Sequence, residues 1–276
     1  MSSRLIIYPT DFSDCAKNAM AYAIAMGKAL QCKIRILHAV ELGSLASVEE
    51  NPDVLLTSIK TLEKQAEMKL VKLKEEIETF GLECEYHILK GRTLFLKDYM
   101  ESLDPLMIVM GTIGKNSLEN KIFGSFAAQT IRNPRSIVLA IPQKAKFNNL
   151  SKIVFATDFH DKDKTCLSFI NKISKYYRSD LQVVHISENV ADLKQEREKF
   201  SQLEAEITKV ISSHNIHFEF LYGDEVEEEL AAFLKSSKPD MLALVTRKRN
   251  FIERIFHKSL SKKIVNQTQV PVLVFT

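Results

Sequence analysis

Three glycines and a serine form the strongest chemical pattern in this chain. An apolar run at residues 106–110 is followed by Gly111 and Gly114, and after nine further residues by Gly124 and Ser125. Glycine lacks a Cβ, so its backbone can reach φ > 0 and approach a ligand closely. The free N–H groups of a helix that starts at Ser125 would suit a phosphate. Glycines in tight turns before a helix would give the same pattern, so it leaves both interpretations open.

The chain also contains a tandem repeat. Residues 5–14 (LIIYPTDFSD) return as residues 152–161 (KIVFATDFHD), and residues 36–39 (ILHA) return as residues 183–186 (VVHI). Both pairs lie 147 positions apart, and a later match lies 134 positions apart. Because the repeat has the size of a whole domain, it indicates two related domains rather than the short units of a solenoid.

Length and composition agree with two globular domains. The 276 residues fit two domains of ordinary size, which we expect at 1–144 and 150–276 with a polar linker between them. The apolar share of 45% and charged share of 26% are typical of a soluble protein. A net charge of +3, spread along the chain, does not favour a nucleic-acid partner. Since no run is long enough for a membrane span and the four cysteines show no paired spacing, we expect no membrane partner and a cytoplasmic location.

In each copy, short apolar runs alternate with longer amphipathic stretches. Continuously apolar strands that alternate with helices predict a parallel sheet covered on both faces. The expected strands are 5–8, 33–39, 84–90, 106–110 and 137–141, then 152–156, 180–186, 217–221, 241–245 and 270–275. The expected helices of the first copy are 15–30, 59–80, 94–103 and 124–132.

Asp11 stands where a ligand would bind in such a sheet. In an open parallel sheet, ligands bind beyond the carboxyl ends of the strands. Asp11 follows the first expected strand and Gly111 follows the fourth, so both would reach that edge. Asp11 could instead cap the helix that begins near Cys15, and Asp158 in the second copy has the same two interpretations.

These motifs together resemble the universal stress protein family. The resemblance rests on YPTDFS at residues 8–13, on LHA at residues 37–39 and on the full glycine spacing, and it covers nearly the whole chain as two tandem domains. It implies an α/β fold of two tandem Rossmann-like domains, each a five-stranded parallel sheet in the order 3-2-1-4-5 flanked by helices. It also implies binding of ATP or another adenine nucleotide, with or without Mg²⁺.

In the branch of the family that binds ATP, two groups of residues surround the nucleotide. The positions expected around adenine are Pro9, Thr10, Asp11 and Ala39. The positions expected to hold ribose and phosphates are Met110, Gly111, Gly114, Gly124 and Ser125. Ala39 is smaller than the valine often found there, which would loosen the contact with adenine.

The second copy departs from the glycine pattern. At the offset of 134, Gly111, Gly114 and Gly124 correspond to Val245, Lys248 and Lys258, while Ser125 is kept as Ser259. Side chains at these positions would block the backbone amides from a phosphate. We therefore expect one nucleotide per chain, held by the first domain. The basic residues 247–258 could form a solvated loop, an anion site made of side chains, or a contact for an acidic partner.

The sequence therefore predicts an ATP-binding protein with a regulatory or stress-response role. An interaction module without nucleotide and a slow ATPase are the alternatives. No Ser-His-Asp set, paired carboxylates or Cys/His metal cluster can be assembled, so at most weak ATP hydrolysis is expected. His38 and His185 are expected to be silent strand-end histidines.

Two further expectations concern assembly and a long connection. In the family, dimers form through the fifth strand, and here the segments 136–141 and 270–275 lie in one chain. We expect them to pair as an intramolecular pseudo-dimer, with a dimer of chains as a further assembly. Residues 41–59, which the second copy lacks, could form a lid, a docking surface or the lead-in to a helix.

Overall fold

The computed structural model describes residues 4–40, 52–90, 93–114, 124–132, 135–211, 215–245 and 269–275. The first half contains β1 (Leu5–Pro9), α1 (Asp14–Leu30), β2 (Lys33–Val40), α3 (Pro52–Glu78), β3 (Cys84–Lys90), α4 (Thr93–Ser102), β4 (Met107–Gly111), α5 (Ser125–Arg132) and β5 (Ile137–Ile141). The second half contains β6 (Lys152–Ala156), α6 (Asp163–Tyr177), β7 (Asp180–Ser187), α7 (Leu193–Val210), β8 (Ile216–Tyr222), α8 (Val226–Ser237), β9 (Met241–Val245) and β10 (Val272–Phe275).

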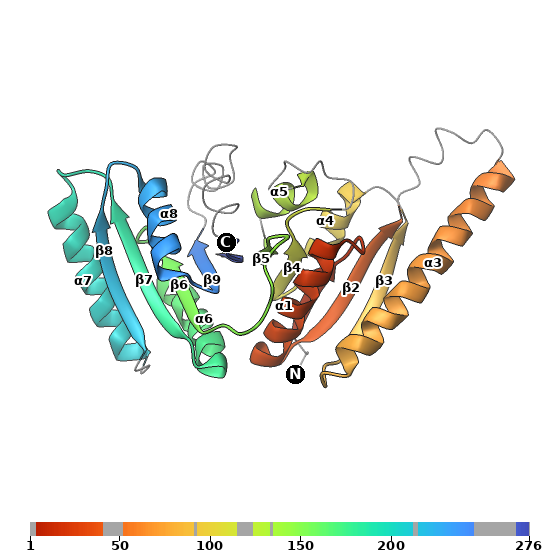
Figure 1. Cartoon of the computed structure of the whole chain (residues 1–276), viewed down its shortest axis with the longest axis horizontal. Helices are drawn as coiled ribbons and strands as arrows, with labels where there is room; N and C mark the ends of the chain where they lie inside the picture. Colours follow the sequence, from red (N-terminus) through yellow and green to blue (C-terminus); the bar gives the residue numbers. More distant parts are fainter. Residues whose placement is uncertain are drawn as a thin grey trace.

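All of these strands belong to one sheet (Figure 1). The ten strands follow the order β3-β2-β1-β4-β5-β10-β9-β6-β7-β8. Every pair within a half is parallel, whereas β5 and β10 pair antiparallel where the halves meet. The expected fold class, two tandem α/β domains with parallel sheets, is confirmed. Each half has its first strand in the middle of its five, between the second and the fourth.

Helices cover both faces of the sheet. Successive side chains of a strand point to opposite faces, and here both sets are buried. On β1, Ile6 and Tyr8 pack on the face covered by α1, α3, α6 and α7, and Ile7 packs on the other face, with α4, α5 and α8. All three side chains are fully buried. The continuous apolar runs of the sequence thus correspond to strands buried on both sides, as the parallel arrangement requires.

The ends of α1 have local causes. Its N-cap is Ser13, whose Oγ accepts a hydrogen bond from the Ala16 N–H at 3.2 Å. The helix ends at Gln31, which adopts the left-handed conformation and donates its N–H to the Gly27 carbonyl. Ser13 therefore fills the capping role that Asp11 could have taken.

Helix α3 begins earlier than the sequence suggested. Its first residue is Pro52 rather than Ile59. A proline is tolerated in the first helical turn because its missing N–H would have no partner within the helix. The helix start expected at residue 59 was therefore placed too late in the sequence. Residues 41–51, which carry most of the expected lid or docking surface, lie outside the described residues.

The expected pairing of the two fifth strands is observed. Strand β5 pairs with β10 so that Leu139 lies opposite Leu273, and both side chains are fully buried. Pro271 lies just before β10, and its carbonyl accepts a hydrogen bond from the Leu242 N–H at 2.9 Å. Because proline has no N–H to donate, this place at the margin of the ladder is the one expected for it.

An aromatic cluster holds the two halves together beside the sheet. Phe147, in the linker, packs edge-on against Tyr22 of α1 at 5.1 Å and against Tyr177 of α6 at 5.9 Å between ring centroids. The Tyr177 hydroxyl donates to the Ala25 carbonyl of α1 at 2.9 Å. Helices α1 and α6 accordingly lie next to each other across the junction. The linker is thus part of the packed interface between the halves.

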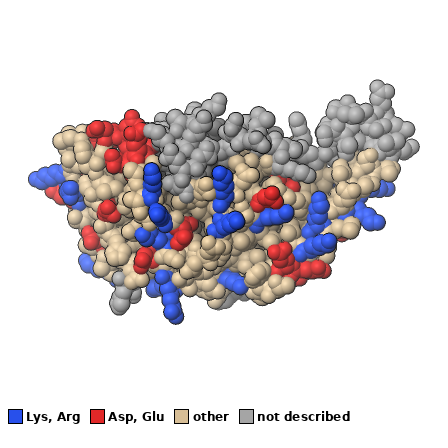
Figure 2. Space-filling view, viewed as in Figure 1, with Lys and Arg blue, Asp and Glu red and all other residues tan. Residues whose placement is uncertain are grey.

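Charged side chains are mixed over the described surface. Figure 2 shows lysine and arginine side chains spread over one face and interspersed with acidic ones. Within the described ranges, no helix is long and apolar enough to cross a membrane.

The junction gives a prediction about stability. Leu139→Ala removes a fully buried side chain opposite Leu273 and leaves a cavity, so we expect the free energy of unfolding to fall by about 2–5 kcal/mol. Leu62→Ala, at an exposed position of α3, is the matched control and should change it little. Urea unfolding followed by circular dichroism measures both, and equal stability of the two variants would contradict the buried junction.

Candidate functional site

The candidate site lies at the carboxyl ends of β1, β2 and β4, which are neighbours in the sheet. Thr10, just after β1, is buried and donates its N–H to the Leu37 carbonyl of β2 at 2.8 Å. The Thr10 Oγ1 accepts hydrogen bonds from the Phe12 N–H at 3.1 Å and from the Tyr8 hydroxyl at 3.4 Å. The loop that follows β1 is therefore bonded to the sheet beneath it.

Phe12 has a backbone conformation that side chains rarely adopt. Its φ is +62°, in the left-handed region. A residue in such a region costs about 1–3 kcal/mol and persists only where the surroundings enforce it. Here the Phe12 ring packs against the His38 ring, with centroids 4.4 Å apart. This packing, with the hydrogen bond to Thr10, holds the loop in the conformation that presents Asp11.

Asp11 and Gly114 meet across the edge of the sheet. The Asp11 Oδ1 accepts a hydrogen bond from the Ser13 N–H at 3.0 Å. The Asp11 Oδ2 lies 2.9 Å from the position that a Cβ would take at Gly114. A Cβ at residue 114 would therefore collide with the carboxylate as it stands. The absence of a Cβ lets the loops after β1 and β4 meet closely here, and we call this junction the cradle.

Gly111 has a different reason to be glycine. A Cβ there would lie 2.9 Å from the Cys15 Sγ and 3.0 Å from the Cys15 carbonyl carbon. The end of β4 thus packs directly against the start of α1, whether or not a ligand binds. Gly111 is required by the packing of backbone on backbone, whereas a Cβ at Gly114 would meet the end of the Asp11 side chain.

The start of α5 is tied to the same edge. The Gly124 N–H donates to the Thr112 carbonyl at 2.7 Å, and the Gly124 carbonyl accepts from the Ala128 N–H at 3.0 Å. Gly124 is buried, and Ser125, the first residue of α5, is exposed. Residues 115–123, between the two parts of the glycine motif, lie outside the described residues.

The remaining predicted residues lie at the same strand ends. Pro9 is buried at the end of β1 and pairs with Leu37, and Met110 is buried near the end of β4. Ala39 is half-buried on β2 and packs against the buried cluster on the face of α4 and α5. All nine predicted residues therefore lie along three adjacent strand ends or at the start of α5.

Buried titratable groups around the site are held neutral. Burial is the main cause that lowers the pKa of His38; Lys69 acts in the same direction, against the Thr10 hydrogen bond and Asp11. Burial also raises the pKa of the Tyr8 hydroxyl and of the Cys15 thiol. The Cys15 thiol is therefore a poor nucleophile at neutral pH. Within the described ranges, no three His, Cys, Asp or Glu side chains could together hold a metal ion.

The second half repeats the loop geometry. Phe159 has φ +52°, its N–H donates to the Thr157 Oγ1 at 3.0 Å, and its ring lies 4.1 Å from the His185 ring. The Thr157 hydroxyl donates in turn to the carboxylate of Asp163. Asp163 is the residue that corresponds to Ala16 of the first half. The exposed Asp158 corresponds to Asp11. Sequence reasoning missed this shared loop, although the repeated Thr-Asp-Phe and histidine pointed to it.

The second half does not repeat the cradle. Val245, which is buried, occupies the place of Gly111. The replacements Lys248, Lys258 and Ser259, together with the rest of the basic segment, lie outside the described residues. Asp163 is almost fully buried, and burial raises the pKa of its carboxyl group. The second half thus keeps the contacts of Phe159 with Thr157 and His185 that hold its loop. It lacks the glycine that, in the first half, packs against α1.

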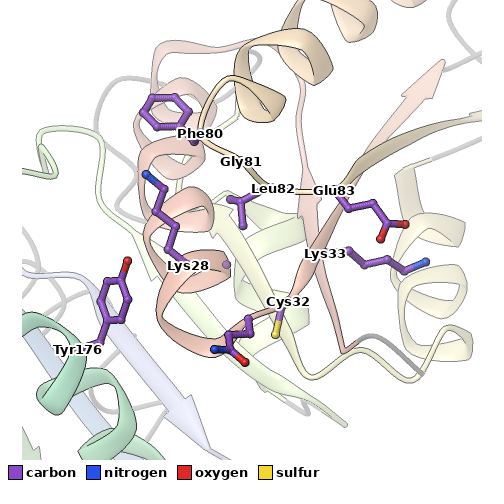
Figure 3. Close-up of a pocket in the computed structure, with 10 residues that line it drawn as sticks. Lys28, Cys32, Lys33, Phe80, Gly81, Leu82, Glu83 and Tyr176 are labelled. Atoms are coloured by element: carbon purple, nitrogen blue, oxygen red, sulfur yellow. The ribbon is translucent and has the colours of Figure 1, made fainter. Parts of the chain in front are cut away.

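A separate groove lies at the opposite, amino-terminal edge of the sheet. It has a volume of about 520 Å³ and is lined by the end of α1, the turn between α3 and β3, and Tyr176 of α6. Figure 3 shows the Lys28 side chain extending toward the Phe80 ring, whose centroid is 4.8 Å from the Lys28 Nζ. None of the nine predicted residues lines this groove, so it is distinct from the candidate site.

Comparisons with known proteins identify relatives of both halves. The model of the universal stress protein family matches residues 3–142 and again residues 149–276. The universal stress protein MJ0531 of Methanocaldococcus jannaschii is 28% identical over 142 residues, which are 51% of this chain and 83% of the relative. The universal stress protein MJ0577 of the same organism is 24% identical over 155 residues, 50% of this chain and 94% of the relative.

A solved structure is similar over the full length. A universal stress protein from Archaeoglobus fulgidus has a TM-score of 0.73 and 17% identity, covering 100% of this chain and 99% of that one. Another, from Pseudomonas aeruginosa, has a TM-score of 0.66 and 13% identity, covering 99% of this chain and 93% of that one. At these identities the likeness supports the fold of two tandem domains.

Replacement by alanine should lower the free energy of unfolding more at Gly111 than at Gly114. Gly111→Ala places a Cβ against the backbone of Cys15, so we expect a loss of about 1–3 kcal/mol in the free energy of unfolding. Among the described residues, the new methyl group of Gly114→Ala meets the end of the Asp11 side chain, which can rotate away, so this change should cost less. Denaturant unfolding of both variants tests this order, and the reverse order would contradict the packing described for Gly111.

The lowered pKa of His38 makes the free energy of unfolding depend on pH. In the unfolded chain a histidine has a pKa of about 6.5, so below that pH the unfolded state binds a proton more readily than the folded state. The stability that comes from neutral His38 is complete at higher pH and is lost as the pH falls through this range. In urea unfolding at about pH 8 and about pH 5, His38→Asn should lose less stability on acidification than the parent chain. An equal loss would show that His38 is not held neutral.

Proposed function

Because the chain belongs to the universal stress protein family, we propose that its first domain binds ATP and that the protein has a regulatory role in a stress response. In this proposal the two domains are residues 1–144 and 150–276, and the protein works in the cytoplasm. The four cysteines are free and buried, which suits a reducing compartment.

The observation that carries the proposal is the close approach of Asp11 to Gly114. The Asp11 Oδ2 lies 2.9 Å from the place of a Cβ at residue 114, so the loops after β1 and β4 meet at this edge of the sheet. Asp11 can accept a hydrogen bond from a ligand there, and the start of α5 offers backbone N–H groups to phosphates. The geometry fits a nucleotide that extends from one loop to the other.

The parts of the nucleotide follow from this arrangement. Adenine would lie among the residues at the ends of β1 and β2, namely Pro9, Thr10, Asp11 and Ala39. Ribose and phosphates would lie along the β4 loop and the start of α5, at Met110, Gly111, Gly114, Gly124 and Ser125. Any Mg²⁺ that accompanies the nucleotide would be held largely by the phosphates, as is usual for this ion.

Regulation fits the site better than dedicated catalysis. Cys15, the thiol nearest to the glycine loop, has a raised pKa and its Sγ donates to the Ile141 carbonyl at 3.4 Å. Within the described ranges, the His38 Nδ1 bonds to the Thr10 backbone carbonyl. A site of this kind can hold ATP, and hydrolysis by it would be slow.

The direct test is to identify and count the bound nucleotide. We expect mass spectrometry of the denatured, purified protein to detect ATP or another adenine nucleotide. Calorimetric titration of the stripped protein should then give one site per chain, because the second copy has Val245, Lys248 and Lys258 in place of the three glycines. One universal stress protein has been solved in complex with cAMP, so cAMP is a second nucleotide to titrate. Two equivalent sites would contradict the asymmetry, and no binding would favour an interaction module.

Two substitutions test where the nucleotide lies. Gly124→Lys should abolish ATP binding, because its side chain would enter the space beside the β4 loop. Asp11→Ala should weaken binding by about 1–3 kcal/mol through the loss of a ligand hydrogen bond. Asp158→Ala, the matched change in the second domain, should leave the affinity unchanged. If Asp11→Ala and Gly124→Lys both bind ATP as the parent does, the site has been assigned to the wrong edge.

A further inference from the structure

Two consecutive residues of β2 hold Thr10 by both of its backbone groups. The Leu37 carbonyl accepts the Thr10 N–H at 2.8 Å, and the His38 Nδ1 lies 2.8 Å from the Thr10 carbonyl oxygen. A carbonyl oxygen can only accept, so Nδ1 must carry the proton of the imidazole. His38 is thus a donor fixed to the backbone of the loop after β1.

This hydrogen bond sets the direction of the next residue. The Thr10 carbonyl belongs to the planar peptide group that joins Thr10 to Asp11, so fixing the oxygen fixes the start of Asp11. The Asp11 carboxylate is held in turn by the Ser13 N–H, and its other oxygen faces the space beside Gly114. A short chain of contacts therefore leads from the His38 imidazole to the proposed ligand cradle.

The second half contains the same bond without the same consequence. The His185 Nδ1 lies 2.9 Å from the Thr157 carbonyl oxygen. Its Nε2 lies 3.3 Å from the Glu196 carboxylate of α7. Among the described residues, the charges that act on His38 are those of Asp11 and of Lys69 on α3. The aspartate of this loop, Asp158, is exposed. The histidine bond therefore belongs to the fold of both halves, and only in the first does it lead to the Asp11–Gly114 cradle.

We propose that His38 is a positioning residue for nucleotide binding: by holding the Thr10 carbonyl, it keeps the Asp11 carboxylate in place beside Gly114. This proposal rests on the proposed ATP site in the first domain. It assigns to His38 a role that composition and spacing did not suggest, and it makes His185 an internal control with the same hydrogen bond.

The test compares ATP affinity among matched variants by calorimetry. His38→Leu keeps the bulk of the side chain but removes the donor, and we expect ATP to bind about 5- to 20-fold more weakly, the effect of one lost hydrogen bond. His38→Asn carries an amide N–H near the position of Nδ1, so its affinity should return to within about threefold of the parent. His185→Leu removes the matching donor in the second domain and should bind ATP as the parent does.

Each outcome is informative when thermal unfolding is measured alongside. The proposal is overturned if His38→Leu binds ATP like the parent, if His38→Asn is as weak as His38→Leu, or if His185→Leu weakens binding to the same extent. If His38→Leu does not fold, His38→Asn is compared with His38→Gln, whose amide lies farther out, and tighter binding by His38→Asn supports the proposal while equal binding overturns it. Absence of ATP binding by a well-folded parent chain would instead refute the proposed function on which this role rests.

Discussion

The position of β1 between β2 and β4 is the constraint on which the candidate site depends. Hydrogen bonds to both neighbours fix β1 in register, so its carboxyl end can only emerge between theirs. Asp11 from β1, His38 from β2 and Gly114 from β4 are distant in sequence, yet the parallel order places them at one edge. Helix α1 then packs so closely on the end of β4 that Gly111 has no space for a Cβ.

Comparing the two halves shows which features of the loop after the first strand recur and which belong to the first half alone. Both keep a threonine bonded to the second strand, a phenylalanine with positive φ and a histidine that holds the threonine carbonyl. These features recur because an unpaired backbone carbonyl at a buried strand end would be costly. Only the first half keeps the glycines, and the second has Val245 instead. The features that both halves share therefore report first on folding. A feature of one half alone can report on packing, as Gly111 does against Cys15, or on binding.

Much of the architecture could be predicted because buried parallel strands leave a strong signal. The expected runs at β3, β5, β6 and β9 match the observed strands at both ends, and β5 and β9 are apolar throughout. The start of α3 was missed because Pro52 can end one helix or begin another. The left-handed Phe12 and the need for glycine at 111 could not be predicted, because both depend on contacts with residues distant in sequence, namely His38 and Cys15.

The junction between β5 and β10 gives the second domain a structural role that does not depend on the glycine motif. An edge strand leaves a row of N–H and C=O groups unpaired, and β5 satisfies its row by pairing with β10. The side chains of Val138, Leu139 and Ala140 are fully buried in the two clusters that run through the junction. Losing the second domain would expose this apolar edge and the aromatic cluster around Phe147. The requirement to cover β5 therefore constrains the fold of the second domain, whereas its ligand edge can change without exposing that strand.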